Sequence, residues 1–247
     1  MTLMEQTHIE SADAGYRIAL GLHAERIAGG WRPVGRKIGF TNRSIWPRYG
    51  VYQPIFGFVY DRTVTHAPDN VAKLKLAGLA QPRIEPEICF GLKARPPRSQ
   101  DPAEILAAIE WVAHSIEIVQ CSWPGWQMKV GDSTAANGLH GALVVGRKIP
   151  VSGIKYLVSK LPALKVTLKK GDQVIDRGMG ANVLDSPLLA LAHLVEVLGA
   201  QSDFPQLCAG EIISTGTMTD AAPVAPGETW STEFEGNELS GMTIRFE

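Results

Sequence analysis

The chain has 247 residues, of which 45% are hydrophobic and 20% charged, and its formal net charge at pH 7 is −1. These values are typical of a globular protein with a sizeable core and exclude a disordered chain. Acidic and basic residues are mixed along the sequence, with no basic run of the kind that nucleic-acid-binding proteins carry.

The three cysteines, Cys89, Cys121 and Cys208, lack both C-x-x-C spacing and the number expected of a disulfide framework. The N-terminal residues 1–15 are too polar for a signal peptide, and no apolar run approaches the ~20 residues of a membrane helix. We therefore expect a cytoplasmic protein that binds neither nucleic acid nor membrane.

The first predicted helix runs from Ser11 to Ala28, with Ala14, Ile18 and Leu22 at spacings of four and Gly29–Gly30 as its end. Glycine and proline then recur through residues 35–63, which predicts short strands and ordered loops there. We expect a single domain that comprises the whole chain, residues 1–247, with residues 1–35 as a helical segment packed on the rest of it.

Two further helices have strong start signals. Asp101 is a candidate N-cap followed by Pro102 and Glu104. The buried face predicted for this helix is formed by Ile105, Leu106, Ile109 and Val112. The third helix begins at Ser186–Pro187 and ends at Gly199, and its apolar face is formed by Leu188, Leu191, Ala192, Val195 and Leu198.

The remaining apolar segments have the lengths and patterns of strands. They include residues 115–123, residues 141–146, a hairpin over residues 163–178 and strands within residues 211–220 and 238–247. Because strands and helices do not alternate, a parallel α/β architecture is disfavoured. The sequence predicts a β-dominated α+β fold with a few peripheral helices.

Two carboxylates, Glu85 and Glu87, alternate with apolar residues in the segment QPRIEPEICFGL, residues 81–92. On a strand they point to the same face about 7 Å apart, where they repel each other. Arg83 on the same face is one candidate for neutralising them, and a hard divalent cation is the other.

Glu117 is a third acid in an apolar strand, within HSIEIVQ. Three acids without a histidine cluster point to an oxygen-only metal site. On spacing alone, the solvated face of an edge strand is the favoured interpretation, and the metal site is the alternative. The sequence contains no G-x-S-x-G, H-E-x-x-H, P-loop or EF-hand motif.

The order of several segments adds information that spacing does not. VGRKIGFTN, GVYQPIFGFVYD, QPRIEPEICFGL, IEIV and AGEIISTGT follow one another along the chain. From about Tyr16 to the C-terminus the sequence resembles the fumarylacetoacetate hydrolase superfamily. Within it, the sequence is most similar to the 2-keto-4-pentenoate (2-hydroxypentadienoate) hydratases and the 2-oxo-3-hexenedioate decarboxylases.

This resemblance implies a mixed β-sandwich or roll, a homo-oligomer, and Mg²⁺ or Mn²⁺ held by Glu85, Glu87 and Glu117. It implies catalytic roles for Lys37, in RKIG, and for Asp61, at the end of GFVYD. The residues that it places at the substrate are Gln81, Arg83, Asp132, Thr215, Gly216 and Thr217.

The implied activity is hydration of a 2-hydroxy-2,4-dienoate to a 4-hydroxy-2-oxo acid through a metal-bound enolate. The first alternative is decarboxylation of 2-oxo-3-hexenedioate (4-oxalocrotonate), and the second is hydrolysis of an acylpyruvate. The alternative that is not an enzyme is a catalytically inactive subunit that binds a small acid or a partner. The chain departs from the family pattern near the third acid and further downstream, which leaves the substrate open. These departures are Gln120, Cys121, Ser122, Leu139 and His140.

Overall fold

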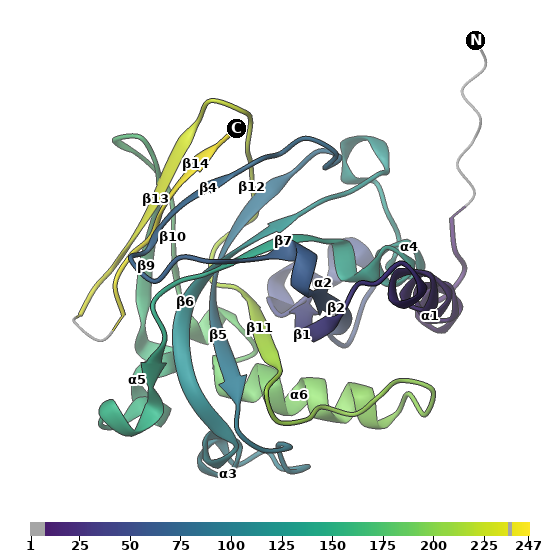
Figure 1. Ribbon diagram of the computed structural model, residues 1–247, viewed down its shortest axis with the longest axis horizontal. Helices are drawn as coiled ribbons and strands as arrows, with labels where there is room; N and C mark the ends of the chain where they lie inside the picture. The colour runs from purple at the N-terminus through teal and green to yellow at the C-terminus, as the bar shows by residue number, and fades with distance from the viewer. Residues whose placement is uncertain (1–7, 237–238) are drawn as a thin grey trace.

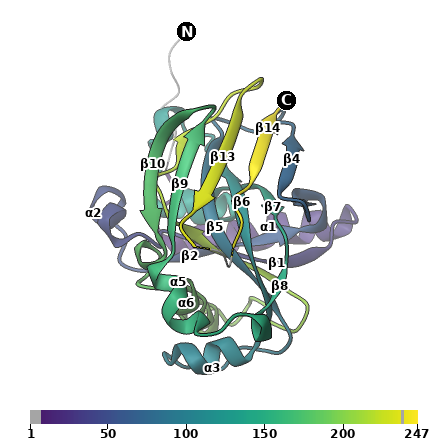
Figure 2. The same ribbon diagram turned by 90° about the vertical axis from the view of Figure 1, so that its left-hand side faces the viewer.

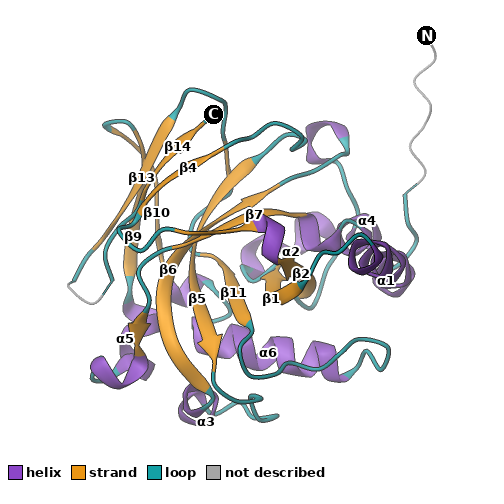
Figure 3. Cartoon of the chain, viewed as in Figure 1, coloured by secondary structure: helices purple, strands orange, loops and turns teal. Residues whose placement is uncertain are grey.

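Two β-sheets with helices around them make up the computed structural model, which describes residues 8–236 and 239–247 (Figures 1 and 3). The larger sheet has the strand order β2-β1-β11-β5-β6-β7-β3, with β12 beside β5 and β8 beside β6. Its strands are β1 (Pro33–Gly39), β2 (Ile55–Tyr60), β3 (Val64–His66), β5 (Arg83–Leu92), β6 (Ile109–Val119), β7 (His140–Val145), β8 (Ile149–Pro150), β11 (Ile212–Thr217) and β12 (Ala222–Pro223).

The smaller sheet has the order β10-β9-β13-β14-β4, which can be followed from side to side in Figure 2. Its strands are β4 (Val71–Leu74), β9 (Lys165–Lys170), β10 (Gln173–Met179), β13 (Thr229–Phe234) and β14 (Thr243–Phe246). The α-helices are α1 (Ala12–Ala28), α2 (Trp46–Tyr49), α3 (Pro102–Ala107), α4 (Val130–Ala135), α5 (Leu157–Ala163) and α6 (Pro187–Gly199). The predicted β-dominated α+β fold with peripheral helices is confirmed.

The two faces of the larger sheet have different surroundings because side chains alternate along each strand. On the outer face, Ile88 and Phe90 of β5 belong to the core under α6, and Ile84 belongs to the core against the smaller sheet. On the inner face, Cys89 packs with Leu143 and other apolar side chains. Glu85, Glu87 and Glu117 have the parity of this inner face, so the fold turns all three acids to the same side.

The helix α6 has the bounds and the buried face that the sequence predicts. The Ser186 hydroxyl accepts from the Leu188 N–H, Pro187 occupies the first turn, and Leu188, Leu191 and Leu198 are fully buried. Residues Gly180–Gly199 are the one described segment long and apolar enough to cross a membrane, and 61% of it is buried inside the protein. Its packing against β11, β1 and α3 accounts for this burial.

The helix α1 has the predicted ends, but its predicted apolar stripe does not face the protein. Ile18 and Leu22 are 46% and 40% exposed, whereas Tyr16 and Ala19 are buried. Gly15 determines this orientation because it lies against α4, where a Cβ atom would come within 2.0 Å of the Thr134 Oγ1. Residues 1–7 of the predicted N-terminal segment lie outside the described residues.

The helix predicted after Asp101 is shorter than expected. Asp101 caps it and Pro102 begins it, but α3 ends at Ala107, and Ile109 and Val112 belong to β6. The prediction was wrong here because tertiary pairing outweighs local helical spacing: β6 pairs with β5 from Ile109 to Val119. For the same reason the strand predicted over residues 115–123 begins earlier and ends at Val119.

The other predicted strands are present. The hairpin over residues 163–178 is the antiparallel pair β9–β10. The strands predicted within residues 141–146 and 211–220 are β7 and β11. The last strand, β14, begins at Thr243, and Glu238, the first residue of the segment predicted there, lies outside the described residues.

Candidate metal centre

Four neighbouring strands of the larger sheet bring the polar residues of the site together. Lys37 of β1 pairs in register with Ser214 of β11, and Glu85 of β5 pairs directly with Glu117 of β6. Because β11 lies between β1 and β5, Lys37 and the acids share the inner face. Like charges directly opposite each other on neighbouring strands destabilise a sheet, so this arrangement needs positive charge nearby.

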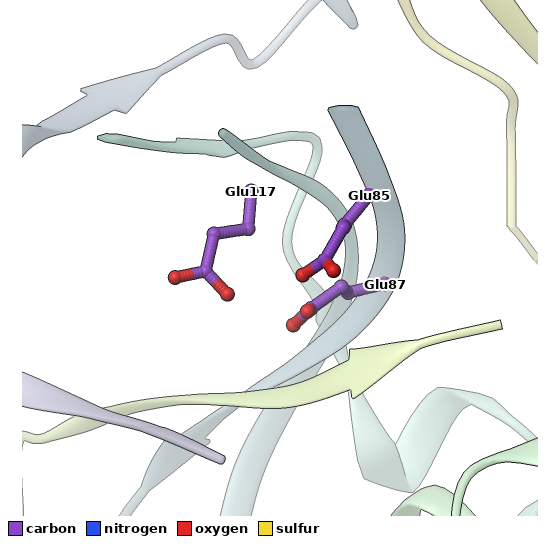
Figure 4. Close-up of side chains that lie close together, drawn as sticks. All are labelled: Glu85, Glu87 and Glu117. Carbon is purple, nitrogen blue, oxygen red and sulfur yellow. The ribbon is translucent and has the colours of Figure 1, made fainter. Parts of the chain in front are cut away.

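The three carboxyl groups point toward one another (Figure 4). One oxygen of each of Glu85, Glu87 and Glu117 lies within 4.8 Å of an oxygen of the other two. Glu87 and Glu117 are fully buried, while Glu85 is partly exposed to the cavity described below.

Each of the two buried acids has one oxygen held by the protein and one without a hydrogen-bond partner. The Oε2 of Glu87 accepts from the Ser214 hydroxyl at 2.5 Å and from the Gly216 N–H at 3.0 Å. Both donors reach it because β11 has a bulge between Ser214 and Thr217. Gly216 fits the bulge with φ +100°, where a Cβ atom would lie 2.0 Å from the Thr41 hydroxyl. The Oε1 of Glu87 makes no hydrogen bond within the described structure.

Glu117 shows the same division between its two oxygens. Its Oε1 lies 2.7 Å from the His140 Nδ1. Its Oε2 has no hydrogen-bond partner in the described part of the chain and lies 3.2 Å from the Lys37 Nζ. The Lys37 ammonium donates to the Gly138 carbonyl at 2.9 Å.

Burial and mutual repulsion set the ionisation of the cluster. Desolvation, with Glu117 adding to it, raises the pKa of Glu85 to about 7. Desolvation and the two neighbouring acids also raise the pKa of Glu87 well above its ordinary value. Burial alone would raise the pKa of Glu117, but Lys37 and His140 outweigh it and lower that pKa. Desolvation likewise acts against the charge on Lys37, but the three acids outweigh it and raise its pKa.

The donor set matches a hard divalent cation. All three ligand candidates are carboxylates, which suit Mg²⁺, Mn²⁺ and Ca²⁺. Buried polar atoms are normally hydrogen-bonded. Within this cluster, however, one oxygen of Glu87 and one oxygen of Glu117 have no hydrogen-bond partner in the described structure. One ammonium group, that of Lys37, cannot neutralise three carboxylates. A bound cation satisfies both the free oxygens and the excess negative charge.

A cavity opens beside the acids. Its charged lining groups among the described residues are Lys37, Glu85 and Arg83. The Arg83 guanidinium stacks 4.3 Å from the centre of the Trp126 ring and makes no ion pair with any described residue. The apolar part of the wall is formed by Ile38, Phe40, Ile45, Ile55, Val119, Met128, Leu139 and Ala221.

Among the other residues predicted to contact substrate, Gly216 and Thr217 line this cavity. Thr215 is buried and donates to the Ile88 carbonyl, so it supports β5 from behind. The Gln81 amide donates to the carbonyls of Cys121 and Trp123 and does not line the cavity. Gln81 holds the loop that carries Trp126.

Two predicted site residues lie elsewhere. Asp61 is at the surface, where its carboxylate accepts from the N–H and the Nε of Arg32 at 3.0 Å. It follows β2, which ends at Tyr60, and it does not line the cavity. Asp132 is fully buried and caps the start of α4 by accepting from the N–H groups of Lys129 and Ile9. Neither residue lines the cavity, and their predicted roles in the site stay predictions.

Three residues without a predicted role complete the site: Ser214, Gly138 and His140 hold Glu87, Lys37 and Glu117. Ser214 lies within the family segment AGEIISTGT. In the sequence, His140 stands out only as a departure from the family pattern. The departures Gln120 and Cys121 lie beside it, where the Gln120 amide donates to the His140 carbonyl and Cys121 is buried.

Residues 47–243 match the model of the fumarylacetoacetate hydrolase C-terminal family. The chain belongs to this family. The match covers most of the sequence and confirms the resemblance inferred from its motifs.

Characterised relatives come from both branches named above. The chain is 34% identical over 242 residues to a 2-hydroxyhexa-2,4-dienoate hydratase of Comamonas testosteroni, a match that covers 96% of the chain and 86% of the relative. It is 29% identical to a 4-oxalocrotonate decarboxylase of Pseudomonas sp. strain CF600, with 95% and 85% covered.

A solved structure of 4-oxalocrotonate decarboxylase from Pseudomonas putida G7, complexed with magnesium and adipate, superposes with a TM-score of 0.85. It shares 26% identity, over 96% of this chain and 86% of that one.

Proposed function

We propose that this protein is a divalent-metal-dependent lyase that adds water to a 2-hydroxy-2,4-dienoate to give a 4-hydroxy-2-oxo acid. Glu85, Glu87 and Glu117 hold the metal, Mg²⁺ or Mn²⁺, and Lys37 is the catalytic cation beside it. Support comes from relatives that are hydratases or decarboxylases and from the magnesium in the solved decarboxylase structure described above.

The observation that carries the proposal is a pair of buried carboxylate oxygens without a hydrogen-bond partner, Glu87 Oε1 and Glu117 Oε2, of which the second is 3.2 Å from the buried Lys37 ammonium. A divalent cation bound there supplies Lewis-acid stabilisation to a substrate oxygen that gains negative charge. The Lys37 Nζ lies 3.2 Å from the Glu117 Oε2 and donates to the Gly138 carbonyl at 2.9 Å. It is therefore placed to donate a hydrogen bond, or to transfer a proton, beside the metal.

The cavity supports a small acid with an uncharged tail. Carboxylate recognition falls to Arg83, which lines the cavity and makes no ion pair within the described residues. Apart from Arg83 and Lys37, the described lining has no cationic group for a second carboxylate, and much of its wall is apolar. An unsaturated acid with a vinyl or alkyl end matches this division better than a diacid.

Decarboxylation of 2-oxohex-3-enedioate is the second candidate, because Arg83 is free to bind a distal carboxylate if the metal holds the 2-oxo acid end. Acylpyruvate hydrolysis has less support. The histidine–acid pair at this site, His140–Glu117, has both ring nitrogens engaged by protein atoms, and no histidine lines the cavity among the described residues. A catalytically inactive binding subunit would have no use for a costly cluster of three buried acids that has one free hydrogen-bonding oxygen on each of Glu87 and Glu117.

The test uses the purified protein with Mg²⁺ or Mn²⁺ and two substrates, 2-hydroxypenta-2,4-dienoate and 2-oxohex-3-enedioate. Ultraviolet absorbance follows substrate loss, and released carbon dioxide is measured in parallel. A Glu87→Gln preparation controls for contaminating enzymes. Loss of the dienoate without gas supports hydration, and gas from the diacid supports decarboxylation. Metal binding with neither reaction would refute both and leave the non-catalytic alternative.

We further propose that the chain forms one catalytic domain, residues 1–247, and acts as a cytoplasmic homo-oligomer in aromatic compound catabolism. The family resemblance supports this extension. Analytical ultracentrifugation of the purified protein measures its oligomeric state, and a monomer at all concentrations would contradict the expectation.

A further inference from the structure

The segment from Asn137 to His140 has an unusual backbone. Asn137, Gly138 and Leu139 have φ values of +56°, +65° and +65°, in the left-handed region that costs energy for residues other than glycine. Asn137 fixes the segment to β2, because its side chain donates to the Phe58 carbonyl at 2.8 Å and accepts from the Phe58 N–H at 2.7 Å. Such strain persists only where the surroundings hold it, and it is common at functional sites.

The segment directs two groups at the metal centre. The Gly138 carbonyl accepts from the Lys37 ammonium at 2.9 Å, and the His140 Nδ1 lies 2.7 Å from the Glu117 Oε1. This short strained segment therefore positions both the Lys37 ammonium group and the Glu117 carboxylate.

The His140 ring is held on both sides. Its Nε2 lies 2.8 Å from the Thr63 hydroxyl, which also lies 3.0 Å from the Tyr60 carbonyl. Because a carboxylate only accepts hydrogen bonds, the Nδ1 of His140 is protonated and donates the hydrogen bond to Glu117. The ring is buried and does not line the cavity, so it contacts Glu117 and not the substrate.

This geometry distinguishes the two oxygens of Glu117. His140 occupies Oε1, and Oε2 is left without a hydrogen-bond partner on the side of Lys37 and the other acids. We propose that His140 is a positioning residue that fixes the Glu117 carboxylate so that only Oε2 faces the cation. This inference rests on the proposed metal site, and it assigns a role to a residue at which the chain departs from the family pattern.

Loss of the Nδ1 donor has a defined consequence. The Glu117 carboxylate would be free to rotate about its last side-chain bond. Its Oε1 would then lack a hydrogen-bond partner, as its Oε2 already does. Removing the group that orients a metal ligand typically lowers metal affinity by about 10- to 100-fold. The same loss is expected here for Mn²⁺.

The experiment measures Mn²⁺ binding to the full chain by isothermal titration calorimetry and by electron paramagnetic resonance of free Mn²⁺. His140→Phe removes the donor, and His140→Asn keeps an N–H near the Nδ1 position. His66→Phe, an exposed histidine on β3, is the control. Each variant is first checked by circular dichroism and by its unfolding midpoint without metal.

The expected result is about 10- to 100-fold weaker Mn²⁺ binding for His140→Phe, substantial recovery for His140→Asn and no change for His66→Phe. Wild-type affinity in His140→Phe would overturn the proposal, and so would equal losses in the two His140 variants, which would indicate packing alone. Failure of the wild-type protein to bind Mn²⁺ would refute the metal site itself. If His140→Phe does not fold, Thr63→Val tests the same chain of contacts. Its Mn²⁺ affinity should fall several-fold, and unchanged affinity would count against the role of His140.

Discussion

Glu85→Gln should make the metal-free protein more stable at pH 8. The pKa of Glu85 is raised from 4.5 to about 7, mainly by desolvation. The folded state therefore binds a proton that the unfolded chain has lost between pH 4.5 and 7, and stability falls as pH rises through this window. A shift of this size corresponds to roughly 3 kcal/mol, and water in the cavity reduces it. Glutamine has no carboxyl group to ionise, so the variant escapes this loss.

Urea denaturation in the presence of EDTA, at pH 5 and at pH 8, measures the effect. The wild-type protein should lose up to roughly 3 kcal/mol relative to Glu85→Gln between the two pH values, with similar slopes against urea. Glu25→Gln, at an exposed acid of α1, is the control and should follow the wild type. Equal stability of wild type and Glu85→Gln at pH 8 would refute the reasoning. It would mean that Lys37 already compensates the charge of Glu85 without metal.

Three further substitutions test the site from different sides. Lys37→Met should lower kcat by roughly 100- to 10,000-fold without preventing Mn²⁺ binding, and a kcat near that of the wild type in steady-state assays would exclude its catalytic role. Arg83→Leu should raise KM about 10- to 100-fold, as expected for a lost charged hydrogen bond, and an unchanged KM would place the substrate carboxylate elsewhere. Asp132→Ala should lower the free energy of unfolding by about 1–3 kcal/mol with kcat/KM unchanged, measured by urea denaturation, and a selective loss of kcat/KM would restore Asp132 to the substrate site.

The acids of the site could be predicted because strand alternation is a local rule. It places Glu85 and Glu87 on the same face, and the structure adds that Glu117 pairs directly with Glu85 across two strands. The helix α6 was predictable for a similar reason, since its cap, its proline and its apolar spacing agree with its burial. Where local preference and tertiary packing point the same way, the sequence alone was sufficient.

The sequence-based predictions fail where contacts between residues far apart in the sequence determine the local structure. Ile109 and Val112 have helical spacing but join β6 because β5 pairs with them. The substrate role of Asp132 stays a prediction, because its carboxylate caps α4 and accepts from the N–H of Ile9, 123 residues away in the sequence. His140 reaches Glu117 only because a left-handed turn precedes it, and no spacing in the sequence signals that turn.

The central claim is that one divalent cation lies between Glu85, Glu87 and Glu117. Anomalous diffraction from crystals grown with Mn²⁺ tests it most directly, because the manganese signal locates the ion without reference to the protein model. The account predicts one peak per chain among the three carboxylates, coordinated by the Glu87 Oε1 and the Glu117 Oε2, and no peak there in Glu87→Gln crystals. No peak in the wild-type crystals, or coordination by the oxygens that Ser214 and His140 hold, would contradict it.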